Sequence, residues 1–300
     1  MVKKNTGFRV MPSRDCEDAC DGMPGEQSVS KPIEIYMFID PLCPECWGLE
    51  PVIKKLQTLY GNYIKIIYFV GRKVNEPPFK QSREYLAKQW ERTASRSGMS
   101  CDGDLWFENP IPSPYIASLA VKAAEFQGRK AAARFLRKIR EFVFLEKKNI
   151  SEKQVLLECA KLAELDVQEF ENDLHSKRAL KAYQCDLKIS SEMEINEYPS
   201  LIFFSENVEE AGIKVSGIVP FDVCVDIMRE ILNHEPVQAK LPTLEEFLQK
   251  YRFVATKEIE VVYDLPAECV EKEMKKLVLK QKVERIPVKY GTFWRYKDND

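Results

Sequence analysis

An α/β fold is predicted by the sequence, because a strand, a helix and a second strand follow one another soon after the N-terminal segment. Residues 33–39, IEIYMFI, are a β-branched and aromatic run typical of a buried central strand. Residues 47–60 repeat apolar side chains at helical spacing and stop at Gly61, and residues 63–70, YIKIIYFV, form the next strand. Together they predict a βαβ unit of the usual size.

Two cysteines stand at the junction between the first strand and the helix. The sequence there is Cys43-Pro44-Glu45-Cys46, and a thioredoxin-like fold keeps its redox pair in this position. A helix N-terminus stabilises a thiolate at Cys43, and Pro44 suits a first helical turn. Glu45 acts in the opposite direction, because its carboxylate disfavours a neighbouring thiolate. We therefore expect no strongly oxidising pair, and both a redox role and a purely structural role stay open.

Pro199 opens a later strand and is the natural partner of the cysteines. Thioredoxin-like folds place a cis-proline loop against the cysteine pair, where the neighbouring backbone can pair with an extended substrate. Tyr198 is expected to supply that backbone edge. The alternative is that Pro199 simply begins an edge strand.

The first domain, predicted over residues 32–233, contains a helical insertion between about residues 80 and 193. Helix starts are readable within it, with capping patterns that begin at Ser151 and at Asp166. After the insertion come two strands and an amphipathic helix, at residues 199–204, 212–220 and 221–232.

A second, smaller domain is predicted over residues 243–297, after a proline-interrupted linker at 233–242. Thr243 begins a capping box and a short helix, a second helix follows, and an apolar stripe marks a third. Two strands joined by a tight loop close the chain. Helix, helix-turn-helix and hairpin together predict a winged-helix-like domain, in which we expect Phe293 and Trp294 to form the core of the hairpin.

The third helix, AECVEKEMKKLVLK at residues 267–280, is poorly suited to nucleic acid. It begins with Glu268, Glu271 and Glu273, where a DNA-reading helix faces phosphates, and it has no arginine for bidentate contacts to guanine. We expect this domain to contact protein and no nucleic acid.

Composition excludes several classes of function. The balance of 45 Lys and Arg against 47 Asp and Glu gives a formal net charge of −2, so no overall attraction to nucleic acid or anionic membrane is expected. No apolar run reaches the roughly 18 residues of a membrane helix, and no signal-peptide pattern is visible. Nine mostly scattered cysteines suit the reducing cytoplasm. With two histidines and no Gly-rich phosphate loop, hydrolase and nucleotide-binding functions are disfavoured.

Residues 1–31 are rich in Gly, Ser, Pro, Asp and Lys without periodicity, so we expect a mobile tail. Within this tail, Cys16 and Cys20 have the spacing of half a zinc site. Zinc would need further ligands from acidic residues, from a folded-back segment or from a second chain. Two free thiols fit the sequence equally well.

Several longer stretches resemble one known family. They are KPIEIYMFIDPLCPECWGLEPVIKKL, WERTASRSGMSCDGDLWFE, QGRKAAARFLR, DLHSKRALKAYQCDLKI and YRFVATKEIEVVYDLPAECVEKEMKKL. These stretches, which lie between Lys31 and Tyr296, are similar to the YjbH family of Gram-positive bacteria, also called the SpxH family, a cytoplasmic branch of the DsbA-like proteins.

The resemblance implies an adaptor of the ClpXP protease that binds the transcription regulator Spx and promotes its degradation in unstressed cells, without enzymatic turnover. It also implies a DsbA-like thioredoxin fold with a helical insertion and a C-terminal winged-helix-like domain. The redox pair carries over to Cys43 and Cys46, and some members have a zinc-binding tail, for which Cys16 and Cys20 are the candidate ligands here. Sensing of oxidation through the cysteines is a further hypothesis. The alternative function is a cytosolic thiol-disulfide oxidoreductase that uses the same pair.

Overall fold

The computed structural model describes residues 5–8, 31–71, 82–207 and 209–298. Cys16 and Cys20, the candidate zinc ligands, lie outside the described residues, as does most of the segment predicted to be a tail.

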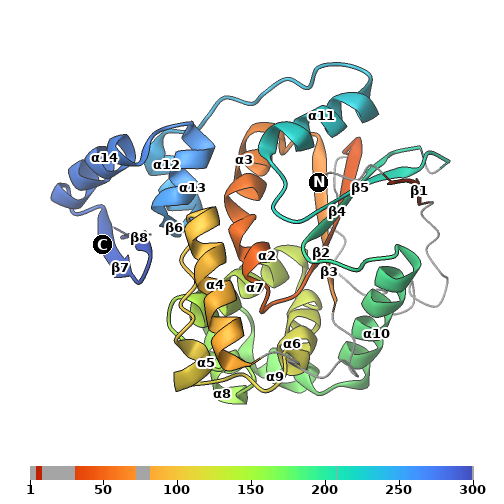
Figure 1. The fold of residues 1–300 in the computed structure, drawn as a ribbon, viewed down its shortest axis with the longest axis horizontal. Coiled ribbons are helices and arrows are strands. Elements are labelled where there is room, and N and C mark those ends of the chain that lie inside the picture. Colours follow the sequence, from red (N-terminus) through yellow and green to blue (C-terminus); the bar gives the residue numbers. More distant parts are fainter. Residues whose placement is uncertain (1–4, 9–30, 72–81, 208, 299–300) are drawn as a thin grey trace.

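A five-stranded sheet forms the centre of the thioredoxin-like part, which comprises the described residues up to 232 (Figure 1). Its strands lie in the order β1-β5-β4-β2-β3, and their bounds are β1 Asn5–Phe8, β2 Ile33–Ile39, β3 Ile64–Val70, β4 Ser200–Ser205 and β5 Gly212–Ser216. β2 pairs in parallel with β3 and antiparallel with β4, so it lies in the interior of the sheet, as its apolar sequence predicts.

Residues 5–8 differ from the mobile tail that was predicted for residues 1–31. They form β1, which pairs antiparallel with the outer side of β5. Without β1, the backbone N–H and C=O groups along that side of β5 have no strand partner, and the pairing satisfies them.

Two helices follow β2 where the sequence predicted one. α2 spans Pro44–Gly48 and α3 spans Glu50–Tyr60, and Leu49 lies between them. Pro51 has no N–H to donate to the carbonyl of Trp47, so a continuous helix is interrupted here. The interruption leaves the cysteine motif on a helix of a single turn.

The predicted insertion is a block of helices that lies mostly below the sheet in the view of Figure 1. The helices are α4 Arg83–Ser97, α5 Leu105–Glu108, α6 Tyr115–Glu125, α7 Arg129–Phe144, α8 Lys153–Leu162, α9 Val167–Leu174 and α10 Lys177–Glu192. Asp166 caps α9, as predicted, and accepts a first-turn backbone N–H at 2.9 Å. The capping prediction at Ser151 is wrong: α8 begins after Glu152, and the Ser151 hydroxyl donates to Asn149 instead.

A buried carboxylate fastens the insertion to the sheet. Asp186 of α10 accepts the backbone N–H of Val70, at the end of β3, at 2.8 Å and pairs with Lys122 of α6 at 3.0 Å. Burial raises the pKa of Asp186 to about 6, although Lys122 opposes the shift. Because the ends of β2 and β3 are adjacent, this attachment lies at the end of the sheet from which the cysteine motif emerges.

The C-terminal part, residues 243–298, follows α11 (Phe221–Leu232) and a connecting segment without regular structure. Its elements are α12 Leu244–Tyr251, β6 Phe253–Ala255, α13 Thr256–Tyr263, α14 Ala267–Leu279, β7 Val283–Val288 and β8 Gly291–Tyr296. In the sheet, the strands lie in the order β6-β8-β7. Along the chain, the order helix, strand, helix, helix, strand, strand is that of a winged helix. Thr243 forms the predicted capping box. β6 was not predicted, because three residues are too few to show an alternating pattern.

A buried ion cluster joins the two parts, on the side of the sheet where α3 and α4 lie (Figure 1). Glu258 of α13 has no exposed surface; it accepts from Lys54 of α3 at 2.5 Å and from Arg137 of α7 at 2.8 and 3.0 Å. Burial disfavours the charged carboxylate, but Arg137 and Lys54 outweigh burial and lower the pKa of Glu258 to about 2. Breaking one of these pairs would leave a buried charge without its partner, which is costly, so the cluster holds the two parts together.

We predict that Glu258→Gln lowers the free energy of unfolding at neutral pH by about 3 kcal/mol, because it leaves the buried Lys54 without its counter-charge. Urea denaturation followed by circular dichroism measures the change. The matched control is Glu273→Gln, since Lys276 contacts Glu273 at 2.7 Å but the two side chains are 54% and 46% exposed. The control should change stability by less than about 0.5 kcal/mol, as exposed pairs do. Equal effects of the two substitutions would contradict this account.

The same carboxylate predicts a loss of stability in acid. Its pKa is about 2 when folded and near the ordinary 4.5 when unfolded, so its contribution is complete above pH 4.5 and is lost as the pH falls toward 2. The stability difference between wild type and Glu258→Gln should therefore shrink between about pH 5 and pH 3, as measured by urea denaturation at each pH. A difference that stays constant over this range would argue against the assigned charge.

Candidate functional site

Cys43 occupies the N-cap of α2, at the end of the sheet. The loop after β2 is held by Asp40, whose side chain accepts the N–H of Leu42 at 2.8 Å and whose carbonyl accepts that of Cys43 at 3.0 Å. The Cys43 thiol accepts the N–H of Cys46 at 3.3 Å and donates to the carbonyl of Tyr198 at 3.4 Å. The thiol therefore lies between a helix N-terminus and the loop that precedes β4.

The Tyr198–Pro199 peptide bond is cis. The structure thus brings together the cysteine pair and the loop that sequence reasoning paired with it. Gly71, just after β3, makes room for the Tyr198 ring: a Cβ at Gly71 would lie 2.1 Å from the Tyr198 hydroxyl oxygen. Gly71 was missed in the sequence, although a glycine directly after a buried strand is a signal of close packing at that point.

The two thiols of the motif have different environments. Cys43 is half-buried, whereas Cys46 has no exposed surface. Burial, together with its hydrogen bond to Cys43, raises the pKa of the Cys46 thiol well above its ordinary value. Cys43 is therefore the thiol that a disulfide in solution can reach, and Cys46 is the one that can attack from inside.

Glu45 does not stand alone beside the thiols, as the sequence argument assumed. Its carboxylate contacts the guanidinium of Arg96 at 2.5 Å, from the last turn of α4. The positive charge of Arg96 offsets the negative charge of Glu45. The two residues are 51 positions apart, and nothing in the local sequence announces the contact.

Trp47, next to Cys46, connects the motif with the C-terminal part. Its ring is fully buried and stacks on Phe144 of α7 and Phe293 of β8, with ring centroids 5.8 and 6.1 Å apart. Phe293 was expected in the core of the hairpin, and Trp294 does lie in the core of the C-terminal part. Phe293 instead belongs to the core of the thioredoxin-like part, because neighbours on a strand face opposite sides.

The other cysteines in the described ranges form no group with the motif that resembles a metal centre. Among the described residues, no three His, Cys, Asp or Glu side chains are arranged to hold a metal ion. The cysteines outside the motif are buried at Cys101, Cys159 and Cys224, half-buried at Cys185 and exposed at Cys269. A zinc site at Cys16 and Cys20 stays a prediction.

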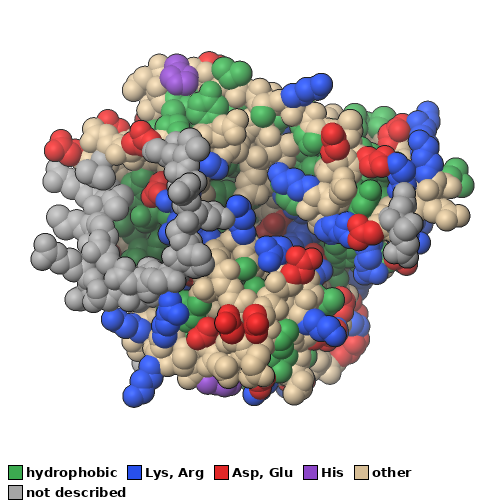
Figure 2. Space-filling model, turned by 180° about the vertical axis from the view of Figure 1, so that it is seen from behind, with side chains coloured by type: hydrophobic (Ala, Val, Ile, Leu, Met, Phe, Trp, Pro, Cys, Tyr) green, Lys and Arg blue, Asp and Glu red, His purple; other side chains and the backbone are tan. Residues whose placement is uncertain are grey.

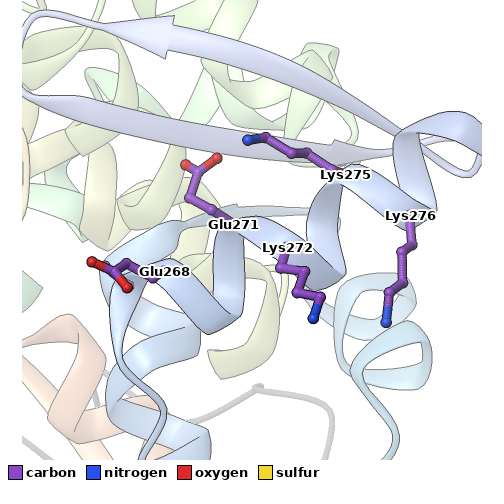
Figure 3. A pocket seen from close by; sticks show the side chains of 6 residues that line it. Glu268, Glu271, Lys272, Lys275 and Lys276 are labelled. Atoms are coloured by element: carbon purple, nitrogen blue, oxygen red, sulfur yellow. The ribbon is translucent and has the colours of Figure 1, made fainter.

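α14 presents a shallow charged surface away from the cysteine motif. Figure 3 shows Glu271 and Lys275 on one side of the helix and Lys272 and Lys276 on the other. Glu268 and Glu271 line the surface nearer the start of the helix, and three lysines follow them, so it offers no uniformly positive face to phosphates. On the face of the molecule seen in Figure 2, Lys and Arg are likewise interspersed with Asp and Glu. No helix in the described ranges has the length and apolar character needed to cross a bilayer.

Comparison with known proteins agrees with this geometry. A thioredoxin family model matches residues 36–226. A Nitrosomonas europaea protein assigned as a protein disulfide isomerase has a similar fold, with a TM-score of 0.58 at 18% identity over 68% of this chain and 97% of that one. This likeness covers the fold of the thioredoxin-like part.

Two curated relatives match nearly the whole chain, the C-terminal part included. The ClpXP adapter protein SpxH of Bacillus subtilis is 50% identical over 92% of this chain and 91% of its own length. The protein of the same name from Halalkalibacterium halodurans is 49% identical over 94% of both chains. With about half of the aligned residues identical over more than nine-tenths of its length, this chain belongs to the SpxH family of ClpXP adapter proteins.

Proposed function

We propose that this protein is a cytoplasmic adaptor that binds the transcription regulator Spx and promotes its degradation by the ClpXP protease. The observation that carries the proposal is the identity of about half of all residues with SpxH proteins along more than nine-tenths of the chain. Relatives that shared only a redox fold would match the thioredoxin-like part alone.

The structure supports a role in binding because it joins two parts into one platform. Glu258 and its partners Lys54 and Arg137 fix the C-terminal part against α3 and α7. A platform of fixed shape loses little conformational freedom when a client binds. An adaptor of this kind raises the local concentration of its client at the protease, and this effect requires no bond to be made or broken.

We predict that Cys43→Ala together with Cys46→Ala preserves the acceleration of Spx degradation in a reconstituted ClpXP assay, within about twofold of wild type. Neither thiol is needed for binding that raises local concentration. The matched control is Cys185→Ala with Cys269→Ala, which removes two thiols that lie outside the motif. A motif variant that is folded yet inactive, beside an active control variant, would refute the non-catalytic adaptor.

A thiol-disulfide oxidoreductase is the second candidate, and the placement of the Cys43 thiol favours it. That thiol lies within 3.4 Å of the Tyr198 carbonyl and of the Cys46 N–H, so reaction partners could meet it at the cis-proline loop. The adaptor proposal predicts that wild type reduces insulin less than about twofold faster than Cys43→Ala does. Turbidity of insulin in the presence of dithiothreitol is the measurement. A much faster wild type would make the oxidoreductase the better account.

A further inference from the structure

The cysteine motif and the C-terminal hairpin are in contact through a single turn of helix. α2 has five residues, and two of them are Cys46 and Trp47. The indole ring of Trp47 lies parallel to the ring of Phe293, with an angle of 3° between their planes. The guanidinium of Arg137 lies 4.4 Å from the centre of the same indole. A movement of Cys46 is therefore a movement of the ring on which the hairpin packs.

A second contact runs through Ser100, in the loop between α4 and α5. Its carbonyl accepts the indole N–H of Trp47 at 3.0 Å, and its hydroxyl accepts the backbone N–H of Tyr290 at 3.2 Å. Tyr290 lies in the turn between β7 and β8. The neighbouring Lys289 pairs with Asp102, of the same loop, at 3.0 Å. The hairpin turn is thus bound to the loop that holds Trp47.

Formation of a disulfide changes the bonds made by the sulfur atoms of Cys43 and Cys46. The Cys43 thiol loses the hydrogen that it donates to the Tyr198 carbonyl, and its sulfur becomes bonded to Cys46. A disulfide draws its two Cβ atoms to within about 4 Å of each other and fixes the torsion between them. Cys46 is buried and its turn of helix is short, so the neighbouring Trp47 must adjust with it.

We propose that the C-terminal hairpin senses the covalent state of Cys43 and Cys46: it packs more tightly on Trp47 when the pair is reduced and more loosely when the pair is a disulfide. The oxidant is a low-molecular-weight disulfide. The Cys43 thiolate attacks one of its sulfurs and releases one thiol, and Cys46 then attacks the Cys43 sulfur and releases the second. The two protons from the cysteines end on the two released thiols.

Linkage makes the effect reciprocal. If the reduced pair favours hairpin packing by a given factor, then hairpin packing favours the reduced pair by the same factor. A substitution that weakens the contact between Phe293 and Trp47 must therefore shift the redox equilibrium toward the disulfide. Such a shift in the redox equilibrium is expected if the two sites are energetically coupled, and it is not expected if they are only close together.

The first experiment uses the wild-type protein and needs neither Spx nor ClpXP. Hydrogen exchange is measured on the reduced protein and on protein oxidised with glutathione disulfide, with the Tyr290 amide as the reporter. Oxidation should speed its exchange at least about threefold, because its bond to Ser100 opens more often. Cys43→Ala with Cys46→Ala, treated with the same oxidant, should show no change. Unaltered exchange in oxidised wild type, or an equal response of the variant, overturns the proposal.

The second experiment measures the equilibrium constant of the pair with glutathione in two variants of β8. Phe293→Leu removes the ring that stacks on Trp47, whereas Tyr296→Leu removes a ring that packs against the core of the C-terminal part. Phe293→Leu should shift the equilibrium toward the disulfide by about threefold to tenfold, where tenfold corresponds to about 30 mV. Tyr296→Leu should leave it within about twofold. Equal constants in both variants and wild type contradict the coupling, whatever the fate of Spx in a degradation assay.

Discussion

The fixed position of the C-terminal part depends on one buried carboxylate. Glu258 pairs with two cations from the thioredoxin-like part, Lys54 and Arg137, and would lose both if the parts separated, whereas Arg137 would keep Glu141 at 2.8 Å. Burial and the nearby Arg137 lower the pKa of Lys54, whereas Glu258 and Glu50 oppose this shift and favour the charged ammonium. A buried ion cluster needs its charges paired with good geometry, because a buried charge without a partner is costly. Further contacts between the parts, including the one at the cysteine motif, add to this attachment.

Fixing the C-terminal part has a consequence for the cysteine motif. In a thioredoxin-like domain that stands alone, an aromatic side chain at the position of Trp47 can be buried only by residues of that domain. Here Trp47 packs against Phe144 and also against Phe293, from near the other end of the chain. The Cys43 thiol stays half-buried beside the cis-proline loop. The motif thus keeps the groups that thiol exchange requires, while the residue next to it has become part of the joint between two domains.

Sequence patterns within short segments predicted the features that depend on neighbouring residues. The strand of residues 33–39, the capping at Asp166 and the cis-proline at Pro199 follow from side-chain type, hydrogen-bonding capacity and position along the chain, and all are found in the structure. Contacts between distant residues were not predictable in this way. The pairing of Glu45 with Arg96 places a cation beside a carboxylate that the sequence argument treated alone, and the cluster at Glu258 joins residues from three separate helices. Such contacts depend on how whole elements pack, which the pattern within a single element does not encode.

β8 shows why the two parts cannot be treated as independent modules. The side chains of Phe293 and Trp294 face opposite sides of the strand, so burying Trp294 in the core of the C-terminal part necessarily turns Phe293 outward from it. Phe253 of the paired strand β6 stacks on Phe293 at 5.0 Å and enlarges the same apolar surface. If the C-terminal part stood free, this aromatic pair would lose the cover of Trp47. Folding of the C-terminal part therefore creates the surface that must dock, and docking places that surface on the helix that carries the cysteines.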